Sequence, residues 1–313
     1  MTSPIYLPEA EVERLALSAS EIADAMVAAF QQRADGQIAM PDKTRLSVAG
    51  SDAFFHAMPA AAPDLLAGVK WVAGSPMNAV RGLPHIDSLL VLSDPTSGRT
   101  LAIIEARYLT GLRTAALSLL AARYLARPNA ARLGLIGCGL QASTHVEALC
   151  AEFPIRSVAM FSRRRASAEA LAERIRARDL ATLVCDVSAA VVAQSDLVVT
   201  SVPAQPGLAG FLDADALPPG AFAAMVDLGR SWRAETVHAF DRGLTDDVAQ
   251  SRAMSGENPT FAAMHFAGDL SGLCSGRVAA RRGADERLAF LFPGNALADL
   301  VAGRCVLDRL GRV

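Results

Sequence analysis

Residues 133–143 read LGLIGCGLQAS, an apolar run that opens into the pattern Gly137-x-Gly139-x-x-Ala142. In a nucleotide-binding βαβ unit, the first glycine permits a tight turn and the second lets the backbone approach a pyrophosphate. A small third residue then lets helix and strand pack closely. The pyrophosphate would lie at the amino end of a helix beginning near Leu140, where free N–H groups favour an anion. A purely structural glycine turn is the alternative.

The sequence around this turn supports the cofactor interpretation. From about residue 131, strand-like and helix-like segments alternate, which predicts fold class α/β with a Rossmann doubly wound parallel sheet. The expected strands are 132–137, 157–162, 183–185, 196–202 and 221–229, and the expected helices are 140–149, 166–177 and 187–194.

The first third of the chain predicts a helix followed by a mixed sheet. Ser18 and Glu21 form a capping-box pattern at the start of the helix, and Gly36 supplies its stop. The strand-like runs that follow are 45–50, 53–58, 68–74, 88–94 and 100–106, before a helix from Leu112 to Ala126.

The closing stretch reads as a glycine turn into a final helix, which we expect to return to the first domain. The domain prediction is a smaller mixed α+β domain over 1–115, completed by the helix 295–313, and a Rossmann domain over 116–294.

Composition excludes several classes of function. The 313 residues carry a net charge of −2, so no strong field recruits nucleic acid or an anionic membrane. The five cysteines are scattered without a C-x-x-C pair, and the histidines lack metal-ligand spacing. No apolar run reaches the length of a membrane span, and the first residues lack the layout of a signal peptide. We therefore predict a cytoplasmic protein with no metal, nucleic-acid or membrane partner.

Lysine is rare in this chain: of 30 basic residues, only Lys43 and Lys70 are lysine. A GC-rich genome is a sufficient explanation for the excess of arginine. Where lysine persists against such a bias, a chemical reason deserves consideration, because lysine can lose its proton and arginine does not.

The end of the second Rossmann strand decides between the two nicotinamide cofactors. An NAD site is expected to carry an acid there, to accept from the ribose 2′-hydroxyl. This chain instead has Ser162, Arg163, Arg164 and Arg165, with no acid before Glu169. Serine and arginine suit a 2′-phosphate, and cations at a helix amino end are unfavourable without a nearby anion. An arginine-rich helix start facing solvent is the alternative. We predict NADP(H), with NAD(H) as the second choice.

With these features together, the sequence resembles the ornithine cyclodeaminase/mu-crystallin family. The matching strings are VKWVAGSP (69–76), RGLPHIDSLLVLSD (81–94), YLTGLRTAALSLLAARYLARP (108–128), LGLIGCGLQASTHVEAL (133–149) and GNALADL (294–300). The resemblance implies a homodimer whose first domain binds substrate and dimerises. Activities of the family include ornithine cyclodeamination, imine or ketimine reduction and alanine dehydrogenation, all at a carbon bearing nitrogen and a carboxylate.

The resemblance also implies roles for individual residues. Arg45, Lys70 and Arg113 match the substrate-carboxylate cluster, although singly each would be an ordinary surface charge. Lys70 is also a candidate proton donor if neighbouring arginines lower its pKa. His85 is a candidate for substrate contact or proton shuttling; a satisfied histidine without a catalytic role is the alternative. The implied cofactor-binding residues are Thr114, Gly137, Gly139, Leu140, Gln141, Ala142, Ser162, Arg163, Arg164, Thr200, Val202 and Gly229.

One departure from the family pattern decides the predicted activity. The cyclodeaminases carry an acid/base aspartate in a segment resembling GGDxPGKxE. Here residues 226–235 read VDLGRSWRAE, and Gly229 occupies the aspartate position. A glycine transfers no proton, and Asp227 substitutes only if the loop brings it within reach. The mu-crystallin-like branch also lacks this aspartate and reduces imines with NADPH.

We therefore predict an NAD(P)H-dependent oxidoreductase that reduces a small, often cyclic, imine or ketimine carboxylate, or interconverts an amino acid and its imine or keto acid. The catalytic candidates are Lys70, Arg113 and Asp227. The first alternative is an ornithine cyclodeaminase that releases ammonia and forms proline with bound NAD. The second is a non-catalytic NADPH- or ligand-binding protein. Candidates for the side-chain pocket are Phe55, Met58, Trp232 and Phe292.

Overall fold

The computed structural model describes residues 3–84, 86–205 and 207–312, so the predicted site residue His85 lies outside the described residues. The chain divides into two compact units. Unit 1 comprises Met1–Arg113 and Gly294–Val313, and unit 2 comprises Thr114–Pro293. Unit 1 is therefore built from two stretches that are far apart in the sequence.

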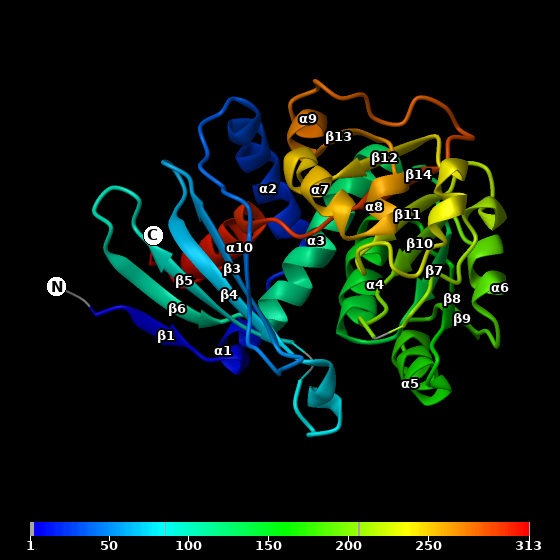
Figure 1. Cartoon of the computed structure of the whole chain (residues 1–313), viewed down its shortest axis with the longest axis horizontal. Coiled ribbons are helices and arrows are strands. Elements are labelled where there is room, and N and C mark those ends of the chain that lie inside the picture. The colour runs from blue at the N-terminus through cyan, green and yellow to red at the C-terminus, as the bar shows by residue number, and fades with distance from the viewer. Residues whose placement is uncertain (1–2, 85, 206, 313) are drawn as a thin grey trace. The chain divides into compact units, whose positions relative to one another are not determined.

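Unit 1 contains a six-stranded mixed sheet in the order β1-β6-β5-β4-β3-β2 (Figure 1). β1 runs parallel to β6, and the other neighbouring strands are antiparallel. The strands are β1 Ile5–Leu7, β2 Thr44–Ser47, β3 Phe54–Ala61, β4 Ala67–Gly74, β5 Ile86–Ser93 and β6 Thr100–Glu105. The helices are α1 Glu9–Arg14, α2 Ala19–Ala34, α10 Ala296–Arg309 and the first part of α3 Arg107–Leu125.

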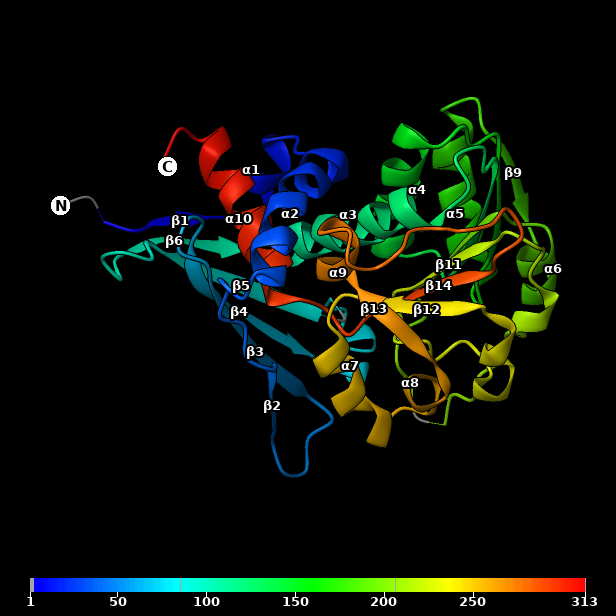
Figure 2. The same ribbon diagram turned by 90° about the horizontal axis from the view of Figure 1, so that it is seen from above.

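The capped helix α10 covers one face of this sheet, and the capped helix α2 packs against α10. The predicted capping box is present at α2, where Ser18 Oγ accepts from the Glu21 N–H at 3.1 Å and the Ser18 N–H donates to Glu21 Oε2 at 2.8 Å. At α10, Asn295 Oδ1 accepts from the Leu297 N–H at 2.9 Å. α10 packs against α2 and against β3, β4 and β5 (Figure 2). The approach is close, since a Cβ on Gly303 would lie 2.7 Å from a Leu92 methyl carbon.

The opposite face of the sheet is apolar and exposed. Because side chains alternate along a strand, the residues next to those under α10 point to this face. Phe55 stacks on Trp71 with ring centroids 5.7 Å apart. Trp71 and Leu89, paired across β4 and β5, are each 38% exposed.

Unit 2 contains an eight-stranded sheet in the order β13-β12-β14-β11-β10-β7-β8-β9, with all neighbouring strands parallel. The predicted doubly wound fold is confirmed. The strands are β7 Arg132–Ile136, β8 Ser157–Phe161, β9 Ala181–Val184, β10 Leu197–Thr200, β11 Phe222–Met225, β12 Arg242–Thr245, β13 Phe266–Asp269 and β14 Leu288–Leu291. The helices are α4 Leu140–Glu152, α5 Arg165–Arg176, α6 Ser188–Ala193, α7 Val248–Ala253, α8 Pro259–Ala263 and α9 Leu270–Cys274.

The strand order creates a switch point at the glycine turn. β7, β8 and β9 follow one another outward, and β10 then pairs with the other edge of β7. In open α/β sheets, ligands bind at the carboxyl ends of the strands where the order reverses. The turn after β7 lies at that place.

Candidate active site

The residues predicted for the site fall in both units. In unit 1, Lys70 and Arg113 are brought together by Asp299. Lys70 Nζ donates to Asp299 Oδ1 at 2.8 Å, and Arg113 Nε lies 2.8 Å from the same oxygen. The three side chains are at most 6% exposed. β4 directs Lys70 toward α10, and Asp299 belongs to the first turn of that helix.

This cluster carries more positive than negative charge, which favours binding of an anion. Burial lowers the pKa of Lys70 to about 7, helped by the Arg113 charge and opposed by Asp299. The Arg113–Asp299 contact is an ion pair by distance, but its Nε–H is not directed along a hydrogen bond. Asp299 Oδ2 is buried and has no hydrogen-bond partner among the described residues. With Lys70 protonated, two cations share one carboxylate, and one positive charge remains uncompensated.

Gly294 and Met58 border the Arg113 guanidinium. A Cβ on Gly294 would lie 3.8 Å from Met58 Cε and 3.9 Å from Arg113 Nη2. Gly294 has φ +99°, a conformation that side-chain-bearing residues rarely adopt. Met58 also pairs with Lys70 across β3 and β4. A small ligand on the guanidinium would therefore contact backbone and a flexible thioether.

Arg45, the third predicted carboxylate ligand, is not part of the buried contact. It is exposed on β2, where it pairs with His56 of β3. Among the described residues, only Lys70 and Arg113 pair with Asp299. Arg45 nevertheless shares the sheet face of Lys70, because β2, β3 and β4 are in register.

In unit 2, the glycine turn has the geometry of a dinucleotide cradle. Gly137 has φ +91°, and a Cβ there would lie 2.8 Å from the Ser201 carbonyl oxygen after β10. A Cβ on Gly139, the residue before α4, would meet nothing within 4 Å, so the space beside it is open. Ser201 Oγ and Gln141 Oε1 are buried there without hydrogen-bond partners among the described residues. These residues fit a pyrophosphate and its nucleotide, as the sequence predicts.

The other predicted cofactor residues lie on α4, on α3 and at the end of β10. Ala142 is fully buried, as close packing of α4 on the strand requires, whereas Leu140 is 43% exposed. His145 fixes the first turn of α4: its Nδ1–H donates to the Gln141 carbonyl at 2.7 Å, and its Nε2 accepts from Ser118 Oγ at 2.9 Å. Burial lowers the pKa of His145 to about 4, so the ring stays neutral. Thr114 and Thr200 are buried, and Val202 is half-buried.

The serine–arginine segment follows β8 directly. Ser162 is half-buried, whereas Arg163 and Arg164 are exposed. Arg163 donates to Gln205 Oε1, and Arg165 pairs with Glu169 at 2.8 Å and with Asp186. Arg164 precedes α5 and has no ion pair among the described residues. The guanidinium groups of Arg163 and Arg164 are therefore accessible at the carboxyl end of β8, the second Rossmann strand.

The structure places Asp227, a predicted catalytic residue, in the interior of unit 2. Asp227 is 3% exposed. Its carboxylate accepts from Thr200 Oγ1 at 2.9 Å, from the Val202 N–H at 3.3 Å and from Ser231 Oγ. Burial raises its pKa, and these hydrogen bonds oppose the rise. These hydrogen bonds connect the Asp227 carboxylate, which follows β11, to the end of β10, and they occupy three of its roughly four acceptor positions.

Hydrogen bonds from Asn258 and Thr260, at the start of α8, hold the loop around Gly229 in place. Leu228 and Gly229 have φ +60° and +67°. Asn258 Nδ2 donates to the Leu228 carbonyl at 2.9 Å, and Thr260 Oγ1 donates to the Gly229 carbonyl at 3.1 Å. A Cβ on Gly229 would lie 2.5 Å from Thr260 Cγ2. The position that holds the cyclodeaminase aspartate therefore has no room for a side chain in this loop.

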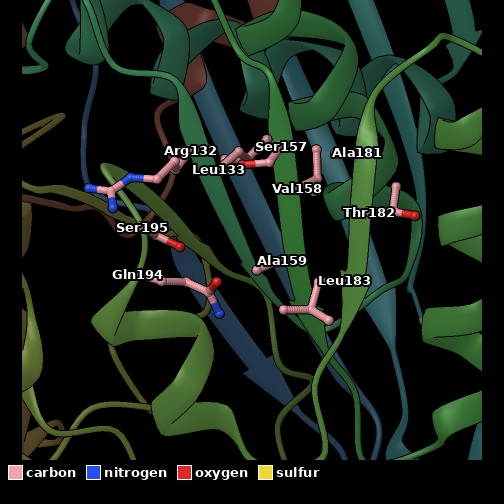
Figure 3. A pocket seen from close by; sticks show the side chains of 10 residues that line it. All are labelled: Arg132, Leu133, Ser157, Val158, Ala159, Ala181, Thr182, Leu183, Gln194 and Ser195. Atoms are coloured by element: carbon pink, nitrogen blue, oxygen red, sulfur yellow. The ribbon is translucent and has the colours of Figure 1, made fainter.

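A cavity of about 190 Å³ lies elsewhere in unit 2 (Figure 3). It is lined by the amino ends of β7, β8 and β9, including Arg132 and Thr182, and by Gln194 after α6. This is the edge opposite the glycine turn, where open α/β sheets do not bind cofactors. In the described part of the chain, no group of His, Cys, Asp or Glu could hold a metal, and no helix is long and apolar enough to cross a membrane.

Asp299 is the functional candidate that sequence reasoning missed. A signal was present, since an acid among the apolar residues of 296–302 must be paired if it is buried. The four residues predicted for the side-chain pocket do not lie in one place. Met58 borders Arg113, whereas Phe55 lies on the other face of the sheet and Trp232 is 1% exposed in the core of unit 2. Phe292 is also buried and stacks on Phe290.

A parallel sheet with a glycine turn at its switch point is the arrangement of Rossmann-type dinucleotide-binding proteins, and unit 1 adds a buried cation cluster. Residues 4–312 match the sequence model of the ornithine cyclodeaminase/mu-crystallin family, and the chain belongs to this family. The resemblance seen in the sequence is thereby confirmed.

Relatives of this chain include dehydrogenases and a reductase. An alanine dehydrogenase of Archaeoglobus fulgidus is 36% identical over 201 residues, which are 64% of this chain and 61% of that protein. The ketimine reductase mu-crystallin of Rattus norvegicus is 29% identical over 98% of this chain and 97% of its own. An archaeal alanine dehydrogenase, solved as a dimer with bound NAD, superimposes with a TM-score of 0.87 at 27% identity, covering 98% of this chain and 96% of that one.

Proposed function

We propose that this chain is an NADPH-dependent reductase of a small imino acid, that is, an imine or ketimine carboxylate. The observation that carries the proposal is the buried Lys70–Asp299–Arg113 cluster, whose surplus positive charge suits a substrate carboxylate. The relationship to a ketimine reductase over almost the whole chain supports the same reaction class. The reverse reaction, oxidation of an amino acid, belongs to the same chemistry, and the alanine dehydrogenases are relatives of that kind.

The cluster residues have distinct roles in this proposal. Arg113 offers a planar fork of donors that matches a carboxylate, with Gly294 leaving room beside it. Lys70, with a pKa of about 7, exists in both protonation states near neutrality and is suited to keep the imine nitrogen protonated. Protonation of the imine nitrogen makes the imine carbon a better acceptor of hydride. Asp299 is a positioning residue that holds both cations, and Arg45 adds charge from the same sheet face.

The glycine turn of unit 2 is the proposed cofactor site. Gly137, Gly139 and the first turn of α4 would hold the pyrophosphate, and Ser162, Arg163 and Arg164 the 2′-phosphate that distinguishes NADPH from NADH. Thr114, Gln141, Thr200 and Val202 are the proposed neighbours of the nicotinamide and pyrophosphate. NADPH held by these residues would supply the hydride for reduction of the imine.

The structure disfavours the cyclodeaminase alternative. Cyclodeamination needs a group that moves protons for amine and water chemistry. Asp227 is buried with its oxygens already accepting hydrogen bonds, and Gly229 is packed against Thr260. A reductase has no such requirement, since Lys70 serves the imine nitrogen.

We further propose that unit 1 binds substrate and also forms a homodimer. Its exposed sheet face carries Tyr6, Leu46, Trp71 and Leu89, which are 38–54% exposed, and such a face suits a second copy of the chain. An archaeal relative is a dimer. The five cysteines are free thiols, which fits a reducing compartment such as the cytoplasm.

The test follows absorbance at 340 nm with NADPH or NADH and pyrroline-2-carboxylate as a generic cyclic imino acid. We expect oxidation of NADPH in preference to NADH, and a severe loss of kcat/KM in Arg113→Ala. The control is Arg14→Gln, which removes a largely exposed charge of α1. Ammonia release from ornithine without net cofactor turnover would instead establish a cyclodeaminase. NADPH binding without turnover of any imine would establish a binding protein.

A further inference from the structure

The loop of residues 227–230 holds both peptide groups of Val202, the second residue after β10. The Val202 N–H donates to Asp227 Oδ2 at 3.3 Å, and the Val202 carbonyl oxygen accepts from Arg230 Nη1 at 3.1 Å. Thr200, the last residue of β10, donates from Oγ1 to the other Asp227 oxygen at 2.9 Å. Two side chains of one loop therefore fix the chain where it leaves the carboxyl end of β10.

The loop that carries these two side chains has little freedom of its own. Gly229, which lies between them, has φ +67°, and its carbonyl oxygen accepts from Thr260 Oγ1 at 3.1 Å and from the Trp232 N–H at 2.9 Å. Trp232 is itself 1% exposed. Asp227 and Arg230 are therefore carried on a backbone that is fixed from both sides.

Asp227 and Arg230 also compensate each other's charge in the interior of unit 2. Asp227 is 3% exposed, and Arg230 is half-buried. Burial raises the pKa of Asp227 and lowers the pKa of Arg230, and in each case the charge of the other group opposes the shift. Hydrogen bonds from or to a charged group are shorter and stronger than those between neutral groups. The pair is therefore suited to hold a peptide firmly.

Strand order places Val202 on the nicotinamide side of the proposed cofactor site. A dinucleotide lies across the point where the strand order reverses, which here is the end of β7. β8, which is followed by the candidates for the 2′-phosphate, pairs with one edge of β7, and β10 pairs with the other edge. With the adenosine half at the end of β8, the nicotinamide half falls at the end of β10.

We propose that Asp227 and Arg230 are positioning residues, which set the place of the nicotinamide ring by fixing Val202. The inference rests on the proposed function, in which Val202 is a neighbour of the cofactor. Hydride transfer tolerates little misplacement, since a displacement of about 1 Å can lower a rate about 100-fold. Neither side chain needs to contact substrate or to move a proton in this role.

The first arm of the test needs no turnover. Calorimetry measures the binding of NADPH and of 2′-phospho-ADP-ribose, which lacks only the nicotinamide; NADH and ADP-ribose are the corresponding pair for NAD(H). In Arg230→Met, which removes the donor to Val202, we expect the affinity for NADPH to fall about three- to tenfold and that for 2′-phospho-ADP-ribose to stay within about twofold. Arg230→Lys keeps a charged donor and should retain most of the affinity. Arg233→Met, which replaces an exposed arginine of the same segment, is the matched control.

The second arm follows oxidation of NADPH, and of NADPH deuterated at the transferred position, with pyrroline-2-carboxylate. Arg230→Met should lower kcat about tenfold and raise the primary isotope effect on kcat, because hydride transfer becomes slower than the other steps. Asp227→Asn hardly changes the volume but removes the counter-charge of Arg230, and it should act in the same direction with a smaller effect. This second variant carries both arms if the Tm of Arg230→Met shows that it does not fold.

The outcomes separate this inference from the proposed function. Equal losses of affinity for NADPH and 2′-phospho-ADP-ribose in Arg230→Met, or unchanged NADPH binding together with unchanged kcat, overturn the inference and leave the reductase proposal intact. A loss confined to NADPH, in a protein that reduces no imine, overturns the reductase proposal and leaves the positioning role. A wild type that binds neither NADPH nor NADH overturns both.

Discussion

Replacing Asp299 by asparagine removes the charge that Lys70 and Arg113 share and hardly changes the volume. Removing one partner of a buried ion pair costs about 3–5 kcal/mol, because a buried charge is left uncompensated. Lys70 limits this cost at high pH, since its pKa of about 7 lies below the ordinary 10.5. Between these values the unfolded chain binds one more proton than the folded chain, so this group makes the wild type more stable as pH rises.

The expected loss in Asp299→Asn therefore depends on pH. At about pH 6, where both cations are charged, we expect the full 3–5 kcal/mol and a fall in Tm of roughly 10 °C. At about pH 9, Lys70 is neutral in the folded protein, and the loss should shrink to about 1–3 kcal/mol, the range for leaving one buried group unsatisfied. Differential scanning calorimetry at both pH values measures the difference.

The matched control is Asp308→Asn on the same helix. Asp308 is 49% exposed and pairs with Arg304 at 2.8 Å, so its loss should cost less than about 1 kcal/mol at either pH. The reasoning is refuted if the two variants have the same Tm at low pH, or if the loss in Asp299→Asn grows as pH rises.

The remaining predictions concern the proton donor, the closed loop and the cofactor. The reductive kcat/KM should fall as pH rises through about 7, where Lys70 loses its proton, and Lys70→Arg should abolish that dependence; initial rates across pH test this, and a flat wild-type profile would contradict it. Gly229→Asp should lower Tm without producing ammonia from ornithine, because its Cβ would lie 2.5 Å from Thr260 Cγ2; adding Thr260→Ser should partly restore Tm. Arg164→Ala should raise the KM for NADPH about five- to tenfold with little change for NADH, and an equal rise for both would argue against 2′-phosphate binding.

Most of the fold was predictable because its signals are local. The switch between strand and helix periodicity after residue 131 predicted β7, β8, β10 and β11, and the capping residues predicted the start of α2. The position of β14, between β11 and β12, was not predictable. Strand order depends on pairing between distant segments, and a short apolar run such as Leu288–Leu291 does not specify its neighbours.

The site was predictable only where one residue type carried its own chemistry. The glycine turn and Lys70 are of that kind. The hydrogen bonds of Asp227 were not predictable, because its sequence spacing indicates a common face but not the donors that contact its oxygens. Asp299 was missed because its partners are distant in sequence; Lys70 is 229 residues away. Such a pairing becomes visible only when α10 is seen against β4.

The return of α10 to unit 1 has a consequence for synthesis of the protein on the ribosome. β4 and Lys70 emerge early, whereas Asp299 emerges only after the whole of unit 2 has been made. Until then, the sheet face that α10 covers remains open, and Lys70 and Arg113 lack their counter-charge. Unit 2 is continuous in sequence and can fold during translation, whereas unit 1 must wait. Chaperone dependence and sensitivity to premature termination should therefore concentrate in the nascent unit 1.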